Sequence, residues 1–138
     1  MEFYEPLYGR IPVPPEYEGI IDSKYFRRLQ YLRQLGLCYL SFPGGNHTRF
    51  EHSLGAFHLA GIVAERIMRS GVGSIDDRVR LGHIIRLACL CHDIGHGPMS
   101  HMSENVLLGL GAKLSHEEVG ASIVSDGLEG ALSPFDRF

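Results

Sequence analysis

The sequence predicts an all-α fold: a bundle of amphipathic helices preceded by an extended N-terminal arm. After residue 20, every periodic segment repeats its apolar residues at helical spacing, and none alternates with the period of a strand. The chain has 138 residues and is 44% hydrophobic, which is enough for one packed core. These two observations favour a single helical domain.

Residues 1–20 are expected to form the extended arm or short strands. They contain Pro6, Pro12, Pro14 and Pro15 and have no helical period. Proline lacks a backbone donor and interrupts regular hydrogen bonding. We therefore divide the chain into an arm over residues 1–20 and a helical domain over residues 21–138.

The first helix is expected from Asp22, as its N-cap, to Leu35. Its apolar residues recur at helical spacing, and Gly36 follows as a residue suited to a left-handed exit. The Pro43-Gly44-Gly45 sequence after it predicts a loop over residues 38–46.

A second helix is expected from about Thr48 to Arg69, before Gly71. At about 100° per residue it has apolar side chains on two flanks, as a central, largely buried helix does. His52 lies on one of these flanks, whereas His58 lies with charged residues. We therefore expect His52 to point into the protein and His58 to face water.

A third helix is expected to begin at Ser74-Ile-Asp-Asp77, which resembles a capping box, and to end near His92. On this helix His83 lies on a polar face, and His92 continues an apolar line. The last turns are apolar on nearly every side, so the terminal carbonyls of a buried helix end need partners.

Two shorter helices are expected in the last third of the chain. Pro98 suits the first position of a fourth helix that ends near Gly109 or Gly111. Ser115-His-Glu-Glu118 is a capping box for a fifth helix, which Gly127 closes.

Composition excludes several classes of protein. A net charge of −3 argues against a nucleic-acid partner, which usually needs a strongly basic face. No apolar run approaches the roughly 18 residues of a membrane span. The N-terminus lacks the features of a secretory signal, and the three cysteines (Cys38, Cys89 and Cys91) form no C-x-x-C pair. We expect a cytoplasmic protein with reduced thiols.

Histidines cluster in the second half of the chain, and the helical projections place some of them inward with an aspartate. His52, His92 and Asp93 are the inward-facing set, with His96 just beyond them. Burying such groups is costly unless a partner compensates. Imidazole and carboxylate ligands are typical of zinc, iron and manganese sites. We therefore predict that His52, His92 and Asp93 bind a divalent transition metal.

Four motifs together resemble those of the HD-domain metal-dependent phosphohydrolases, especially the deoxynucleoside triphosphate triphosphohydrolases. The resemblance covers about residues 5–128. The motifs are Arg33-Gln-Leu-Gly36, His47-Thr-Arg-Phe-Glu-His-Ser-Leu-Gly55, Cys91-His-Asp-Ile-Gly-His-Gly-Pro-Met-Ser-His101 and His116-Glu-Glu118.

This resemblance implies an HD-domain helical bundle and roles for individual residues. His52, His92 and Asp93 match metal ligands, and His96 and His116 match catalytic histidines. Glu104 occupies the place of an aspartate that pairs with the first of these histidines, so it either orients His96 or is a solvated helix carboxylate. The remaining matches are substrate-binding: Arg49 for phosphate, Gln34 and Leu35 for the sugar and base pocket, and His101 as a further pocket histidine.

The resemblance also implies hydrolysis of deoxynucleoside triphosphates to deoxynucleoside and tripolyphosphate, with iron, manganese or zinc in the site and magnesium accompanying the nucleotide. An HD phosphohydrolase of another phosphate ester is one alternative. A truncated module that binds nucleotide without turnover is another, because the family's fourth ligand, an aspartate on a later helix, has no match here. We expect either the N-terminal part of a longer HD domain or a short form that binds metal poorly.

The full-length form is expected to be a homo-oligomer. Arg27, Arg28 and Arg33 lie on the first expected helix. We expect them to form its solvated face or an oligomer contact.

Overall fold

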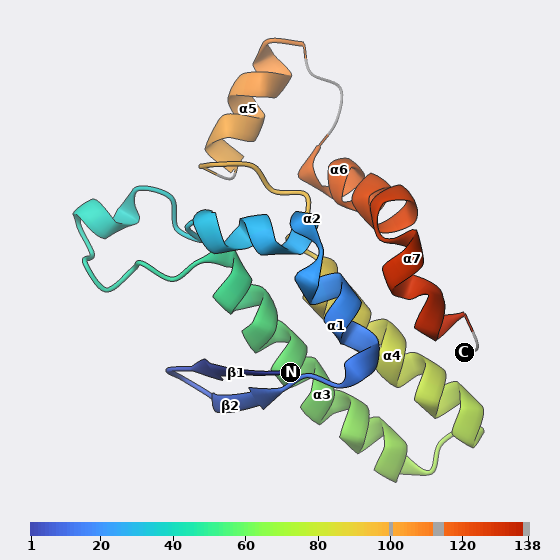
Figure 1. The fold of residues 1–138 in the computed structure, drawn as a ribbon. Coiled ribbons are helices and arrows are strands. Elements are labelled where there is room, and N and C mark those ends of the chain that lie inside the picture. Colours follow the sequence, from blue (N-terminus) through green and yellow to red (C-terminus); the bar gives the residue numbers. More distant parts are fainter. Residues whose placement is uncertain (100, 112–114, 137–138) are drawn as a thin grey trace.

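The computed structural model describes residues 1–99, 101–111 and 115–136 and confirms a helical bundle with one small hairpin (Figure 1). Two strands and the longer helices are β1 (Glu2–Glu5), β2 (Gly9–Pro12), α1 (Pro15–Asp22), α3 (Arg49–Ser70), α4 (Ile75–Cys91), α5 (His101–Gly109) and α6 (His116–Ser122). Shorter elements are α2 (Lys24–Arg27), η1 (Arg28–Tyr31), η2 (Cys38–Leu40), the π-helical turn η3 (Ile123–Gly127), α7 (Glu129–Leu132) and η4 (Ser133–Phe135).

The N-terminal twenty residues differ from the expected extended arm. β1 and β2 form an antiparallel hairpin, which agrees with short strands, but α1 follows as a helix. Pro15 occupies its first turn, where proline is tolerated because that N–H has no helical partner. Tyr17, Ile20 and Ile21 of α1 are fully buried. This segment is therefore part of the core.

The expected helix over residues 22–35 is largely wrong. Only α2 and η1 are helical, and Ser23, not Asp22, is the N-cap, with its Oγ accepting a hydrogen bond from the Phe26 amide. Leu32 then adopts an extended conformation, and its carbonyl accepts from the Arg49 amide at 2.7 Å. Gly36 has the expected left-handed backbone, with φ of 55°.

α3 confirms the central predicted helix. Thr48 and Glu51 form a reciprocal capping box at its start, and Gly71 ends it with φ of 69°. The chain then turns into α4, whose N-cap is Ser74 as predicted, and the two helices pack side by side (Figure 1). The Ala64 Cβ lies only 3.3 Å from where a Cβ on Gly82 would be, so the helices approach closely.

One core joins segments from both ends of the chain. It is formed mainly by α1, α2, η1 and α3, together with Leu90 and Ile94 near the end of α4. Leu128, just before α7, is also buried, and Ala131 lies against Gly19 of α1. The C-terminal elements thus pack on the N-terminal ones and fix the position of α6.

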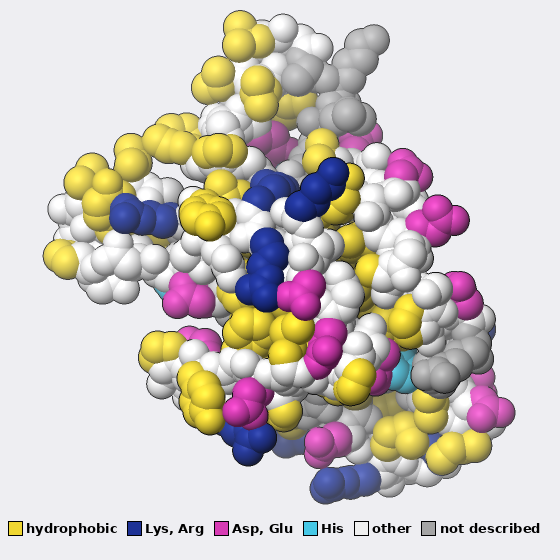
Figure 2. Space-filling view, in the orientation of Figure 1, with side chains coloured by type: hydrophobic (Ala, Val, Ile, Leu, Met, Phe, Trp, Pro, Cys, Tyr) yellow, Lys and Arg dark blue, Asp and Glu magenta, His cyan; other side chains and the backbone are white. Residues whose placement is uncertain are grey.

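α5 begins at His101, later than the expected start at Pro98, and it buries no side chain. Figure 2 shows apolar side chains gathered over α5 and over the segment around η2. The exposed ones include Leu37, Leu40, Phe42, Val106 and Leu107. Among the described residues, no helix combines the length and apolar character needed to cross a membrane.

Candidate metal centre

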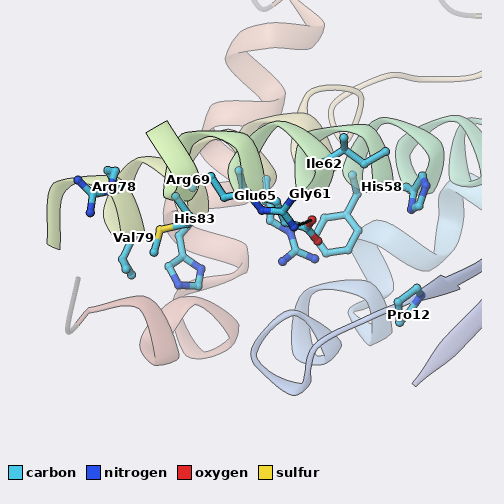
Figure 3. Close-up of a pocket in the computed structure, with 14 residues that line it drawn as sticks. Pro12, His58, Gly61, Ile62, Glu65, Arg69, Arg78, Val79 and His83 are labelled. Atoms are coloured by element: carbon cyan, nitrogen blue, oxygen red, sulfur yellow. Dashed lines mark hydrogen bonds and ion pairs between the residues drawn. The ribbon is translucent and has the colours of Figure 1, made fainter. Parts of the chain in front are cut away.

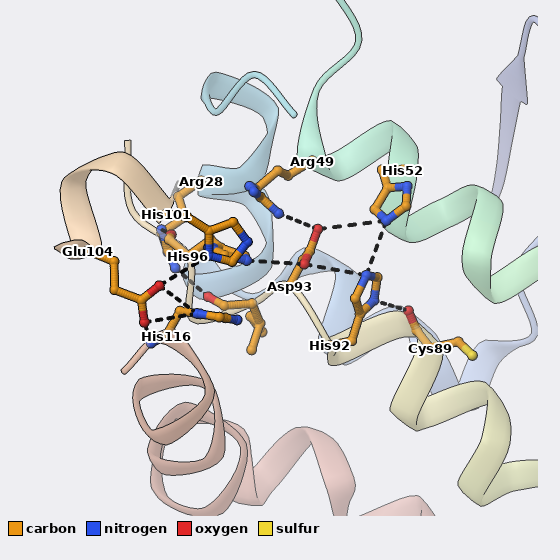
Figure 4. Close-up of polar contacts among 11 residues, drawn as sticks. Arg28, Arg49, His52, Cys89, His92, Asp93, His96, His101, Glu104 and His116 are labelled. Carbon is orange, nitrogen blue, oxygen red and sulfur yellow. Dashed lines mark hydrogen bonds and ion pairs between the residues drawn. The ribbon is translucent and has the colours of Figure 1, made fainter. Parts of the chain in front are cut away.

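The predicted ligands meet where α3 and α4 lie together (Figure 4). His52 is in the first turn of α3, and His92 and Asp93 follow the last residue of α4. The Nε2 atoms of His52 and His92 lie 3.1 Å apart. The Asp93 carboxylate oxygens lie 3.8 Å from the His52 Nε2 and 3.4 Å from the His92 Nε2.

This donor set fits a divalent metal. Two atoms that bind one tetrahedral zinc at about 2.0–2.1 Å are roughly 3.3 Å apart, close to the separations observed. The His92 Nδ1 lies 2.9 Å from the Cys89 carbonyl, which orients the ring with Nδ1 as donor and Nε2 as acceptor. Partial burial lowers the pKa of His52, although Asp93 opposes this, so its lone pair is available at neutral pH.

The two α3 histidines differ from the expected orientations. The His52 side chain is 40% exposed, because it borders a surface hollow lined with His92, Ala56, Ala88 and Cys89. His58 is half-buried, and its ring lies 5.2 Å from that of Tyr8 in the N-terminal hairpin. The hairpin covers a helix face that the projection alone assigns to solvent.

Arg49 and Asp93 form a buried ion pair, with 2.5 Å between Nη1 and Oδ2. Both side chains are less than one-tenth exposed. Burial raises the pKa of Asp93, but His92 and Arg49 outweigh it and lower the pKa overall. Asp93 is thus held as a carboxylate, and in this structure the guanidinium predicted to bind phosphate contacts a predicted metal ligand.

His96 lies next to Asp93 and is almost fully buried. Its Nε2 is 3.5 Å from the Asp93 Oδ1, and its Nδ1 has no hydrogen-bond partner in the described part of the chain. Burial, with help from Arg49 and His116, lowers the pKa of His96 to about 4. The imidazole is therefore neutral near pH 7.

Glu104 organises the other two predicted histidines. Its carboxylate accepts from the His116 amide at 2.8 Å, lies 3.0 Å from the His116 Nδ1 and 3.2 Å from the His101 Nδ1. The bonds from His116, then the one from His101, lower the pKa of Glu104 to about 2. The contacts of Glu104 in the described structure are with His116, whose ring stacks on His96, and with His101, which is exposed, so any effect of Glu104 on His96 is indirect.

A close backbone approach places α6 against the turn after α4. A Cβ on Gly95 would lie 2.0 Å from the His116 carbonyl and 2.5 Å from the Gly120 amide nitrogen. Only glycine allows these two segments to touch at this distance. The contact explains why His116, a helix-start residue, lies inside the site. The sequence signal is the glycine in His-Asp-Ile-Gly-His, which the predicted site does not include.

Gln34 and Leu35 lie in the segment beside the start of α3. The Gln34 backbone amide donates to the His47 carbonyl at 3.0 Å, and the side-chain Oε1 of Gln34 is buried without a partner in the described structure. Leu35 is 46% exposed. The structure therefore puts both residues near the N-terminus of α3, and their substrate-binding role stays a prediction.

Arg28, expected on a solvated face or in an oligomer contact, does not lie on a solvated face. It is half-buried, and its guanidinium contacts the backbone carbonyls of Ile94 and His96. His83, expected on a polar face, is half-buried, with its Nδ1 2.8 Å from the Tyr17 hydroxyl. Burial raises the pKa of Cys91 to about 12, so it is a protonated thiol at neutral pH.

A groove lies apart from this cluster of predicted site residues. It runs between α3 and α4 and has a volume of about 490 Å³ (Figure 3). His58, Glu65, Arg69, Arg78 and His83 are among its lining residues. None of the predicted site residues lines this groove, so its size does not identify the chemistry.

Known proteins resemble most of this chain. The family model of the HD domain matches residues 49–131. The deoxynucleoside triphosphate triphosphohydrolase SAMHD1 of Xenopus laevis is 40% identical over 94% of this chain, and its human counterpart is 41% identical over 83%. An HD domain-containing protein of Acanthamoeba polyphaga mimivirus is 38% identical over 87%.

The matched regions are 22%, 18% and 29% of these relatives, so the chain spans less than a third of their length. The family match includes α3, α4 and α6, the elements that bring the histidines and Asp93 together. The chain belongs to the HD domain family.

Proposed function

We propose that this protein is a metal-dependent phosphohydrolase that converts deoxynucleoside triphosphates to deoxynucleoside and tripolyphosphate. The observation that supports it most is the convergence of His52, His92 and Asp93 next to a second histidine cluster. The similarity to relatives named deoxynucleoside triphosphate triphosphohydrolases supports the substrate class.

His52, His92 and Asp93 are the residues that would hold a divalent ion. Iron, manganese and zinc all accept this donor set, and magnesium is expected with the triphosphate. Such an ion makes water a stronger nucleophile and polarises a phosphoryl oxygen. Arg49 keeps Asp93 ionised and fixes its orientation through their buried ion pair.

His96, His116 and Glu104 are the proposed catalytic group. Attack by water at the α-phosphorus breaks its bond to the 5′ oxygen of the sugar, which then requires a proton. A neutral His96 is a poor proton donor to this oxygen, but a triphosphate beside it would raise the pKa of His96. Glu104 accepts from the His116 and His101 rings and so stabilises one tautomer of each.

Substrate contacts are proposed for Gln34, Leu35, Arg49 and His101. His101 is the most accessible of these to a ligand, since its side chain is 68% exposed. Arg49 could reach phosphate only in competition with Asp93. A homo-oligomer of the full-length protein is also proposed, and the exposed apolar residues of α5 are a candidate contact.

The first experiment is elemental analysis of protein purified without chelator. Native protein is compared with His92→Ala and Asp93→Ala, and with His47→Ala as a control at an exposed histidine outside the ligand set. We expect near-stoichiometric metal in the native and His47→Ala proteins and loss of metal in the other two. Metal that persists in both ligand variants contradicts the site.

The second experiment identifies the reaction by its products. Metal-loaded protein is incubated with each deoxynucleoside triphosphate, and the products are separated. Deoxynucleoside with tripolyphosphate supports the proposal. Monophosphate with pyrophosphate, or turnover of another phosphate ester only, indicates the alternative hydrolase. Nucleotide binding with no turnover by metal-loaded protein indicates the non-catalytic module.

A further inference from the structure

We propose that Arg28 is a positioning residue for the metal centre, because its guanidinium holds the turn that carries the ligands. From η1, its Nη1 donates to the His96 carbonyl at 2.6 Å and its Nη2 donates to the Ile94 carbonyl (Figure 4). The consequence for hydrolysis rests on the proposed function, but the effect of Arg28 on the turn does not depend on it.

The turn needs donors from outside its own sequence. α4 ends at Cys91, and a helix terminus leaves its last carbonyls without helical partners. Within the turn, the Ile94 amide donates to the Cys91 carbonyl at 3.0 Å and the His96 amide donates to the Asp93 carbonyl at 3.1 Å. These bonds leave the Ile94 and His96 carbonyls to Arg28.

The shape of the guanidinium suits this task. Its two terminal nitrogens have a fixed separation in one plane, so they hold two carbonyls in one relative orientation. Ile94 and His96 are two residues apart, and the backbone between them is therefore restrained. Within the described chain, the Arg28 guanidinium forms no ion pair with a carboxylate. Its partners are the backbone carbonyls of Ile94 and His96.

Arg28 and Arg49 contact different parts of the same turn. Arg49 holds the Asp93 side chain through an ion pair, whereas Arg28 holds the backbone that follows it. The distance of 3.5 Å between the His96 Nε2 and the Asp93 Oδ1 depends on both anchors. Loss of Arg28 is expected to release the backbone and to loosen the ligand geometry.

The test compares Arg28→Gln and Arg28→Lys with Arg27→Gln, the matched control. Arg27 is the neighbouring arginine, and it pairs with Asp22 on the surface at 2.5 Å. Zinc affinity is measured by competition with a chelator, and amide exchange at Ile94 and His96 is measured in metal-free protein. Both quantities report on the turn without requiring hydrolysis.

We expect Arg28→Gln to weaken zinc binding by about 10–100-fold, as loss of an outer contact to ligands does. Exchange of the His96 amide should rise about tenfold or more, because its local opening is no longer opposed. For both quantities, Arg28→Lys should lie between native protein and Arg28→Gln, since a single ammonium cannot hold two carbonyls as the planar guanidinium does. Arg27→Gln should leave both quantities near native values.

Chemical rescue separates positioning from general destabilisation. In Arg28→Ala, added methylguanidinium should partly restore zinc affinity and amide protection, and methylammonium should not. The proposal is overturned if folded Arg28→Gln matches native protein in both measurements, or if Arg27→Gln loses as much. If Arg28→Gln does not fold, absence of rescue in Arg28→Ala overturns it. A native protein that hydrolyses no nucleotide refutes the proposed function alone, because the exchange result stands independently.

Discussion

The imidazole rings of His96 and His116 lie nearly parallel, with centroids 3.9 Å apart and an interplanar angle of 11°. His96 belongs to the turn after α4, and His116 begins α6. The pair exists because Gly95 allows the turn to touch α6 and because Glu104 holds the His116 ring. Each of these contacts can be tested separately.

Replacing Gly95 with alanine should separate the stacked histidines. The new Cβ would meet backbone atoms of His116 and Gly120, so α6 must move. We expect a loss of at least about 2 kcal/mol in the free energy of unfolding, measured with urea. Gly130→Ala is the control, because its Cβ would meet nothing within 4 Å in α7. Equal stability of the two variants would contradict the close approach.

Glu104→Gln should reduce hydrolysis through His116. A glutamine keeps one acceptor oxygen but has an NH₂ donor in place of the other, so it can no longer accept from both the His116 and His101 rings in their present tautomers. We expect kcat to fall by about 10²-fold or more with a smaller change in KM, measured at saturating metal. Glu117→Gln, at an exposed position of α6, should behave as native. A native kcat in Glu104→Gln would remove Glu104 from the catalytic group.

Asp93→Asn should destabilise the metal-free protein as well as weaken metal binding. It removes the carboxylate that pairs with the buried Arg49 guanidinium, which costs about 3 kcal/mol or more. Asp22→Asn breaks the exposed pair with Arg27 and should cost less than about 1 kcal/mol. Urea unfolding in chelator measures both. Similar small losses would show that the Arg49 pair adds little stability.

Metal-free protein should lose stability as the pH falls from about 6.5 towards 4. The pKa of His96 is about 4 when folded against 6.5 ordinarily, so the unfolded chain binds the proton first. The contribution of His96 is complete above pH 6.5 and is lost down to about pH 4, with a slope of at most about 1.4 kcal/mol per pH unit.

Urea unfolding across this range checks the prediction in native protein and in His96→Gln. In His96→Gln the free energy of unfolding should fall less steeply as the pH is lowered. Part of the fall should remain, because the pKa of His52 is also lowered. His47→Gln, at an exposed residue, serves as the control. An unchanged slope in His96→Gln would show that His96 is not held neutral by the fold.

Local sequence signals determined the helices with strong caps. The Thr48–Glu51 and Ser115–Glu118 boxes and the glycine after α3 confirm that capping chemistry is readable without tertiary information. The segment over residues 22–35 shows the opposite case. Its apolar spacing suits a helix, but Leu32 is extended and its carbonyl bonds to the Arg49 amide, a tertiary contact.

The sequence by itself also selected His52, His92 and Asp93 as candidate ligands, and the structure brings these three side chains together. It could not determine the second layer around them. Arg28 reaches the turn after α4 from η1, and Glu104 pairs with His116 and not with His96. Such contacts depend on how separate elements pack, and neither periodicity nor capping specifies that packing. Only the tertiary structure decided them, through the backbone contact at Gly95 and the burial of charged groups between helices.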